Sequence, residues 1–509
     1  MLSRLLYLEP GQLRRLAPFF GLYLLLFAAL TLADGLSLTL LIKQAGAEQL
    51  PRIQGWAAAA TLAATFWYLC KAGEAPSATV FQWILAGPLA LFGLLWVAIH
   101  GLGADSTWLG GLLIGRELAF ALVLLHFGTY LQDFFTRDEL NRVMPIVYAG
   151  GRLGGIVGGA LLEHLPGLCP VGHLMLLVSA LLALGMVATW WISRCVAQVD
   201  DVPSPPTKDH NIRIDRPHPQ PATPRGNPAR PQANKKSADI PADEAQAVAS
   251  LAGFLRFVLT NRLMFWISAT TLVYFACRTF LSYRCGLYFD GVFTTDAEMA
   301  QFLGRYTQWA LAGSLIIQLF VVNRWIALAG LQGAQLTYAG LLLVASLLSA
   351  TSMTLASAVF IRLVEGELRY SLRNPVSQMI VNRFSRPLRL RARAWSLGLL
   401  IPLSTLAASA VLSLEASTDG WGVLLAGTVA LGVSYFVGSF AMARCLSDAP
   451  SNAAAASRPH QDMPRERDAA RSEQIERAWA GQWNARHQAA PGATSYLPEN
   501  GVSPAASCR

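Results

Sequence analysis

Ionisable side chains lie inside otherwise apolar segments of this sequence, and they are the residues best placed to do chemistry. A charged group at the centre of a bilayer costs about 2.5–3.5 kcal/mol on insertion scales, so it usually pairs with another charge or faces a water-filled path. Arginine also binds phosphate and carboxylate through paired hydrogen bonds. The buried charges gather in four segments and are Asp34, Arg116, Glu117, Arg278, Arg284, Arg362, Glu365, Glu367, Arg369 and Arg373.

Arginines outnumber acids in this set, which favours an anionic solute. We expect the solute-binding residues to be Arg116, Glu117, Arg278, Arg284, Arg362 and Arg369. We expect Asp34, Glu365, Glu367 and Arg373 to form salt bridges or to couple transport. The alternative is purely structural, with all of these charges joining two parts of the molecule as ion pairs.

The segments that must position these charges are long and apolar. Hydrophobic residues make up 53% of the 509 positions, charged residues 14%, and the mean hydropathy is +0.40. Soluble proteins are about 25% charged, and a helix needs about 20 apolar residues to cross a bilayer. We therefore predict an all-α membrane protein with twelve transmembrane helices, near residues 18–42, 53–71, 79–100, 107–133, 144–164, 172–193, 263–289, 301–323, 328–350, 355–381, 394–414 and 421–444.

The chain divides into two six-helix halves. The predicted parts are an N-terminal half at 1–195, a polar and largely disordered cytoplasmic linker at 196–258, a C-terminal half at 259–445 and a polar cytoplasmic tail at 446–509. Outside the predicted helices, Lys and Arg lie mostly in segments that would share one side of the membrane, with Lys43 and Arg52 as exceptions. The positive-inside rule therefore predicts that both termini are cytoplasmic, and we expect a bacterial inner membrane.

The two halves look related to each other. Glu117-Leu118 and Glu367-Leu368 are 250 positions apart, and each pair lies in the fourth predicted helix of its half. Two related halves joined by a cytoplasmic linker are typical of the major facilitator fold. In that arrangement helices one, four, seven and ten line the central cavity, and these four helices hold most of the deep charges.

Other kinds of site find no support in the sequence. P-loop, HExxH, GxSxG and EF-hand motifs are absent, and the seven cysteines show no CxxC or zinc spacing. We therefore expect no enzyme activity, no metal and no cofactor. The net charge of +9 comes from loops and tails beside apolar segments, so we expect the partner to be a lipid bilayer and not a nucleic acid. We also expect a monomer.

The fifth predicted helix is unusually rich in glycine. Its glycines recur at intervals of four and form two adjacent stripes, Gly150, Gly154 and Gly158, and Gly151, Gly155 and Gly159. Small residues at this spacing let helices approach closely, so we favour dense packing, with a hinge for rocking as the alternative. Arg152 lies within the stripes, and we expect it to pair with an acid of another helix.

His126 lies in the fourth predicted helix, about two and a half turns after Glu117. No second histidine or cysteine stands at metal-ligand spacing from it. A packed histidine is the simpler interpretation, and a proton relay is the alternative.

Several stretches resemble the ATP/ADP translocases of plastids and intracellular bacteria. They keep their order between about residues 15 and 415, apart from the linker. They are Asp34-Gly35-Leu36 with residues 46–51, Glu117-Leu118 with residues 131–133 and 138–145, residues 302–306, and residues 369–375 followed by Met379 and residues 391–394.

The resemblance implies the fold of that family, a branch of the major facilitator superfamily, and ATP/ADP-antiporter-like nucleotide transport. Four positions depart from the family pattern, and one of them is an acidic position of its seventh helix, which falls on an uncharged residue near Ser282. Ala33 stands where the family has a lysine, Asn374 stands where it has an acid, and Arg369 keeps the charge of a family lysine. The expected substrate is therefore a nucleotide or another phosphorylated or organic anion.

The sequence thus predicts a secondary transporter that works by alternating access. Because no ATP-hydrolysing motif is present, an exchanged or co-transported solute would drive uphill movement. One alternative is a proton-coupled carrier of another small solute. A second alternative is a non-transporting membrane scaffold or sensor, which predicts fully paired deep charges and no solvated cavity.

Overall fold

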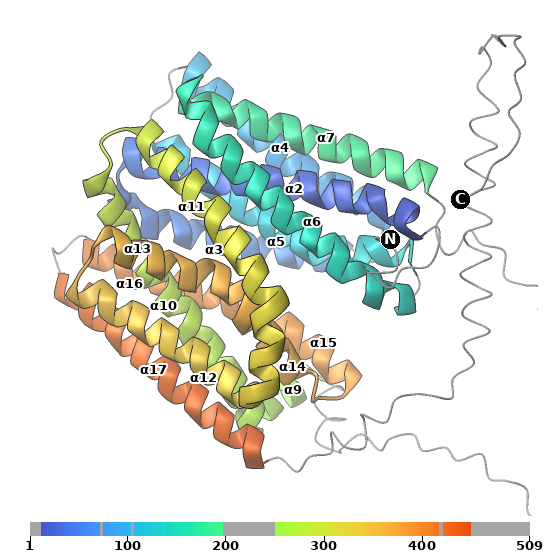
Figure 1. Ribbon diagram of the computed structural model, residues 1–509, viewed down its shortest axis with the longest axis vertical. Coiled ribbons are helices and arrows are strands. Elements are labelled where there is room, and N and C mark those ends of the chain that lie inside the picture. Colours follow the sequence, from blue (N-terminus) through green and yellow to red (C-terminus); the bar gives the residue numbers. More distant parts are fainter. Residues whose placement is uncertain are drawn as a thin grey trace, which may run out of the picture.

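The computed structural model describes residues 12–71, 75–102, 106–135, 137–196, 250–416 and 421–448. Within these ranges every regular element is helical, and the helices form two bundles that lie side by side (Figure 1). The predicted all-α membrane fold is therefore confirmed. Most of the predicted linker and tail, residues 197–249 and 449–509, lies outside the described residues.

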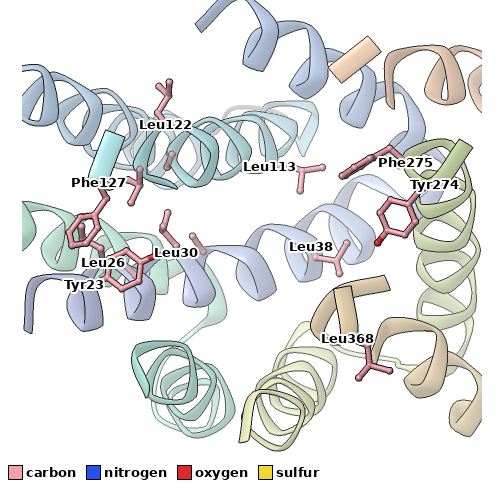
Figure 2. Packing of buried hydrophobic residues seen from close by; sticks show 14 of the residues in the cluster. Tyr23, Leu26, Leu30, Leu38, Leu113, Leu122, Phe127, Tyr274, Phe275 and Leu368 are labelled. Atoms are coloured by element: carbon pink, nitrogen blue, oxygen red, sulfur yellow. The ribbon is translucent and has the colours of Figure 1, made fainter. Parts of the chain in front are cut away.

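The first bundle holds six long helices, the first of which is enclosed by others of this bundle. The six helices are α2 (Gln12–Leu40), α3 (Leu50–Lys71), α4 (Ser77–Gly101), α5 (Gly110–Gln132), α6 (Arg137–His164) and α7 (Leu174–Cys195). Helix α2 contacts α5, α6 and α7, and it is apolar around most of its circumference, as expected for an enclosed helix. Figure 2 shows Tyr23 of α2 beside Phe127 of α5, with ring centroids 4.4 Å apart.

The second bundle is built from more numerous, shorter segments. They are α9 (Leu251–Thr260), α10 (Arg262–Val292), α11 (Asp296–Ile316), α12 (Val322–Thr351), α13 (Leu355–Arg362), α14 (Asn374–Val381), α15 (Arg386–Arg393), α16 (Ile401–Ala416) and α17 (Trp421–Asp448). Two successive π-helical turns, Leu363–Glu367 and Arg369–Arg373, connect α13 to α14 as one helical run. Another, Ala394–Leu400, connects α15 to α16. The two bundles meet mainly where α6 packs on α11 and α3 packs on α16.

Nine helices in the described part of the chain are long and apolar enough to cross a membrane. They coincide with nine of the twelve predicted spans. The other three predicted spans fall on α3, on α11 and on the run from α13 to α14, which are helical but fall short in length, hydropathy or charge. Large apolar side chains stay exposed on the outer faces, including Leu184 and Val187 of α7 and Trp309 of α11, as suits a surface covered by lipid.

Two boundaries differ from the sequence prediction. The sequence separates the eighth and ninth predicted spans at residues 324–327, whereas the chain bends at Gly330, which has a φ of 69°. Glycine adopts this left-handed conformation without steric cost. The predicted linker includes residues 251–258, but they belong to α9, whose first turn is capped by the Ser250 hydroxyl accepting from the Gly253 amide at 3.0 Å.

The glycine stripes of α6 lie at close helix contacts. A Cβ on Gly154 would overlap the backbone carbonyl of Leu24 in α2, and a Cβ on Gly158 would lie 2.5 Å from the carbonyl oxygen of Ala28. Gly159 faces the other bundle, where a Cβ would lie 3.0 Å from the carbonyl oxygen of Gly304 in α11. One side of α6 therefore packs inside its own bundle and the adjacent side packs against the other bundle.

We expect Gly154→Ala to lower stability, because the added methyl group must displace the backbone of α2. Overpacking of this kind costs about 1–3 kcal/mol. The matched control is Gly21→Ala on α2, where a Cβ meets no atom within 4 Å and alanine favours the helix by about 0.5–1 kcal/mol. Thermal unfolding of the purified proteins in detergent measures both changes, and equal melting temperatures for the two variants would contradict this packing.

Candidate solute-binding site between the two halves

A cavity of about 110 Å³ lies between the two bundles. Residues from α2, α3 and α5 line it on one side, and residues from α10, α13 and α16 line it on the other. Its charged residues are Asp34, Arg116, Glu117, Arg278 and Arg362. The structure thus brings together charges from the first, fourth, seventh and tenth predicted spans.

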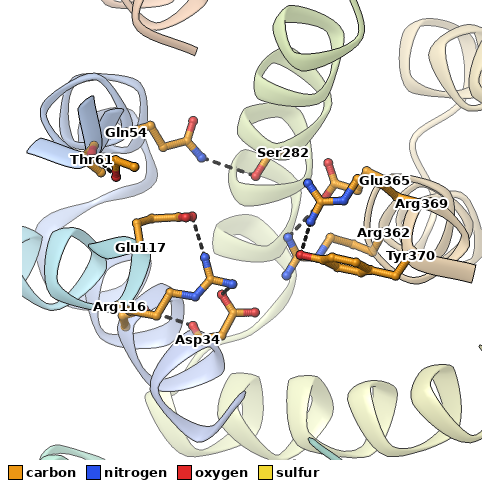
Figure 3. A network of polar contacts seen from close by, with 12 residues as sticks. Asp34, Gln54, Thr61, Arg116, Glu117, Ser282, Arg362, Glu365, Arg369 and Tyr370 are labelled. Atoms are coloured by element: carbon orange, nitrogen blue, oxygen red, sulfur yellow. Dashed lines mark hydrogen bonds and ion pairs between the residues drawn. The ribbon is translucent and has the colours of Figure 1, made fainter. Parts of the chain in front are cut away.

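In the first bundle, two carboxylates share one guanidinium. Arg116 of α5 lies 2.7 Å from Asp34 of α2 and also pairs with Glu117, its neighbour in sequence (Figure 3). The Arg116 side chain is 13% exposed, whereas those of Asp34 and Glu117 are 36% and 35% exposed. All three side chains line the cavity, and the two carboxylates are more exposed than the arginine.

In the second bundle, the pairing is different. Arg362 of α13 pairs with Glu365 at 3.1 Å. Arg278 of α10 lines the cavity and makes no ion pair with any described residue, and its Nε is buried without a hydrogen-bond partner. Arg278 interacts electrostatically with Glu365, but that carboxylate pairs with Arg362, so Arg278 has no carboxylate to itself in this part of the chain.

Arg369 and Arg373 lie beside aromatic rings. The guanidinium of Arg369 lies 4.3 Å from the ring centroid of Tyr370 and donates to the Tyr370 hydroxyl. That of Arg373 lies 4.0 Å from the ring of Tyr274, and its Nε donates to the Tyr435 hydroxyl at 3.4 Å. Both add positive charge to the second bundle, although neither lines the cavity.

The π-helical turns fix where these charges point. A π turn leaves backbone carbonyls without the usual helical partner, and such turns are frequent at functional sites. Here the Tyr274 hydroxyl donates to the carbonyl of Glu365 at 3.2 Å, and the Tyr338 hydroxyl donates to the carbonyl of Val364 at 3.1 Å. The two tyrosines hold the irregular backbone that carries Arg362 and Glu365.

Arg152 joins the halves at the level of the cavity charges. Its Nη1 lies 2.7 Å from Glu367, and the two side chains are 16% and 17% exposed. The expected acid partner on another helix is therefore present, and it is one of the residues predicted to form a salt bridge.

Two other residues singled out in the sequence lie away from the cavity. The sequence predicts that Arg284 binds solute, but its Nε donates to the carbonyl of Ser349 in α12 at 3.4 Å, within the second bundle. His126 is buried, with Nδ1 3.1 Å from the Tyr68 hydroxyl and Nε2 2.8 Å from the carbonyl of Ser77. These contacts are those of a packed histidine.

Neutral polar residues of the cavity do not stand out in the sequence. Gln54 of α3 donates to the Ser282 hydroxyl of α10 at 3.4 Å, across the two halves. Thr61 and Thr405 also line the cavity. Polar residues such as these are common in membrane helices, so the one signal available is their position on helices that meet at the bundle interface.

A second polar contact region, here called the end latch, fastens the halves at one end. Lys43 donates to the carboxylate of Asp290 at 2.9 Å and to the carbonyl of Phe293 at 2.8 Å. Nearby, Glu163 pairs with Arg305 at 2.7 Å. A wider hollow of about 670 Å³ at the same end lies between residues 166–171 and 294–297, but it is open at the surface and lacks the central charges.

Comparisons with known proteins find likeness in structure and not in sequence. No protein family and no curated protein matches the sequence. Among solved structures, a mutant of the nucleoside transporter NupG is 13% identical, with a TM-score of 0.56 over 85% of this chain and 100% of its own. The POT family transporter PepTSo is 10% identical, with a TM-score of 0.56 over 85% and 98%. A bacterial homologue of the iron transporter ferroportin is 14% identical, with a TM-score of 0.52 over 85% and 99%.

The chain is thus an integral membrane protein with the fold of major-facilitator-type transporters. The matched proteins are described as carriers of different solutes, and their identity to this chain is low. The likeness therefore defines the fold, and the solute must be argued from the cavity itself.

We expect Glu367→Gln to lower stability by about 3 kcal/mol, the lower end of the loss when one member of a buried ion pair is removed. Arg152 would then be left in a mostly buried position without its partner. The reversed pair, Arg152→Glu with Glu367→Arg, should recover part of the loss. A double-mutant cycle of thermal unfolding measures the coupling, and additive effects would show that the pair does not interact.

We expect Lys43→Met to open the latched end, because it removes the cation that holds Asp290 and Phe293. The rate at which a membrane-impermeant maleimide labels a cysteine placed at Gln54, in a cysteine-free background, should rise several-fold. Arg52→Met is the matched control, since Arg52 is an exposed cation at the same end. Equal labelling rates in Lys43→Met and the parent would contradict a latch at this position.

Proposed function

We propose that the chain is a secondary transporter that moves a small organic or phosphorylated anion by alternating access. The central observation is Arg278, a cation that makes no ion pair with any described carboxylate, in a cavity formed by both halves. Such a group is costly within a membrane unless an anion or water meets it. A bound anion would supply the missing partner.

The arrangement of contacts supports alternating access. The cavity lies between bundles that are joined by a few separable polar contacts, the end latch and Arg152–Glu367. Breaking and remaking such contacts is a physical route to exposing the cavity on either side. We propose that the latched end faces outward and that both termini are cytoplasmic, in the inner membrane of a bacterium, as the distribution of Lys and Arg favours.

A scaffold or sensor function is less favoured by the same observations. That alternative requires every deep charge to be paired and the space between the bundles to be filled. A cavity is present, and Asp34 and Glu117 are each about a third exposed within it. Solute movement, and not catalysis, therefore accounts best for the site.

Proton coupling is a second candidate, because Asp34 and Glu117 share a single arginine. Two carboxylates beside one cation carry an excess negative charge, which a proton could neutralise. Nucleotide exchange is a narrower form of the main proposal. The sequence resemblance supports it, but a nucleotide would need a wider cavity than the one of about 110 Å³ found in this conformation.

We expect proteoliposomes that contain the protein to take up labelled phosphorylated or carboxylate anions, nucleotides included, above the level of empty liposomes. Arg278→Gln should lower kcat/KM about tenfold to hundredfold, the effect of losing one charged hydrogen bond. The matched control is Arg256→Gln, at an exposed position of α9.

Uptake measured with and without a pH gradient separates exchange from proton coupling. In the proton-coupled case, uptake collapses with the gradient and with Glu117→Gln. No uptake of any of these anions by folded protein, including those that also carry an ammonium group, would contradict the proposed function.

A further inference from the structure

The charges around the central cavity are divided between the halves by sign. The first bundle contributes two carboxylates, Asp34 and Glu117, and one guanidinium, Arg116. Among the described residues its wall therefore carries an excess of one negative charge. This excess is a property of the first bundle alone.

The opposing wall has the opposite sign. Arg278 and Arg362 line the cavity from the second bundle, and Glu365 neutralises Arg362. Arg278 then remains as the excess positive charge. Arg369, which makes no ion pair with the described residues, lies behind this wall and adds to it.

On each wall, the atoms that a solute would contact carry the same sign as the excess charge of that wall. Each of Asp34 and Glu117 engages Arg116 through one carboxylate oxygen, and each side chain is about a third exposed. The second oxygen of each is thus available to a donor in the cavity. On the other wall Arg278 offers N–H groups, one of which is buried without an acceptor.

The size of the cavity limits the solute. Its volume of about 110 Å³ lies well below the range of about 300–1,000 Å³ typical of pockets for drug-sized ligands. A solute with few heavy atoms fits this space. Opposite charges at its two ends would meet the two walls together.

We propose that the solute is a small zwitterion, whose carboxylate or phosphate binds Arg278 and whose ammonium group binds Asp34 and Glu117. This inference rests on the proposed function and narrows its solute to an organic or phosphorylated anion that also carries an ammonium group. The anionic end contacts the second bundle and the cationic end contacts the first, so the solute itself bridges the two halves. Charge pairing across a space of low dielectric is strong, which makes the bound solute a contact between the bundles.

Binding of matched probes to the purified full-length protein tests this assignment at pH 7. The probes are 4-aminobutyrate with butyrate and butylamine, and phosphoethanolamine with ethyl phosphate and ethanolamine. We expect at least one zwitterion to bind tenfold or more tightly than its matched anion and amine, by calorimetry and by thermal stabilisation. Equal or tighter binding of the plain anions, or no binding of either zwitterion to protein that unfolds cooperatively, overturns the proposal.

Two variants locate the two ends of the zwitterion. Arg278→Gln should weaken binding of the zwitterion and the matched anion alike. Glu117→Gln leaves Asp34 and Arg116 as a neutral pair, so the matched anion should now bind about as well as the zwitterion. This gain of anion binding cannot come from a misfolded protein, and a preference for the zwitterion that survives Glu117→Gln overturns the assignment.

Control variants and a transport measurement separate this inference from the proposed function. Arg194→Gln and Glu48→Gln remove a charge of each sign away from the cavity and should keep the wild-type preference. If proteoliposomes take up plain anions while zwitterions neither bind nor compete, the zwitterion assignment fails and anion transport stands. If no solute of either kind is taken up, both fail.

Discussion

The pairing of charges in an apolar surrounding is the constraint on which this structure depends. Ten ionisable residues lie in four segments that the sequence predicts to span the membrane, and each must find a partner, water or a solute. Arg116 pairs with two carboxylates, Arg362 pairs with one, and Arg152 pairs across the halves with Glu367. These pairs leave one negative charge in excess on the first bundle and Arg278 in excess on the second, and these two charges determine what the cavity can hold.

The backbone supplies the geometry for this pairing at two places. The glycines of α6 bring its backbone against α2 and α11, so the halves touch closely beside the charged centre. The π-helical turns of the run from α13 to α14 depart from regular helix, and Tyr274 and Tyr338 donate hydrogen bonds to two backbone carbonyls in the first of these turns. Close packing and local irregularity thus position the same group of charges.

Much of this arrangement could be predicted from the sequence, because membrane helices need long apolar runs and buried charges stand out within them. The two-bundle fold, the meeting of Asp34, Arg116, Arg278 and Arg362, and an acid partner for Arg152 follow from that pattern. The direction in which the Arg284 side chain points could not be predicted, because the rotation of a helix about its axis depends on the helices packed against it. The contact between Gln54 and Ser282 could not be predicted, because neutral polar residues are common in membrane helices. The bend at Gly330 could not be predicted either, because glycine is also common in these helices.

The irregular turns between α13 and α14 have a consequence for how this segment tolerates insertions and deletions. A π turn holds one residue more than a regular α-helical turn, and each residue rotates a helix by about 100°. Removing one residue between 363 and 373 would shorten the segment only slightly, but it would swing every later side chain around the axis. Arg373 would then lose its contacts with Tyr274 and Tyr435. In this stretch a change in chain length therefore alters the direction of the later side chains far more than their position along the helix axis.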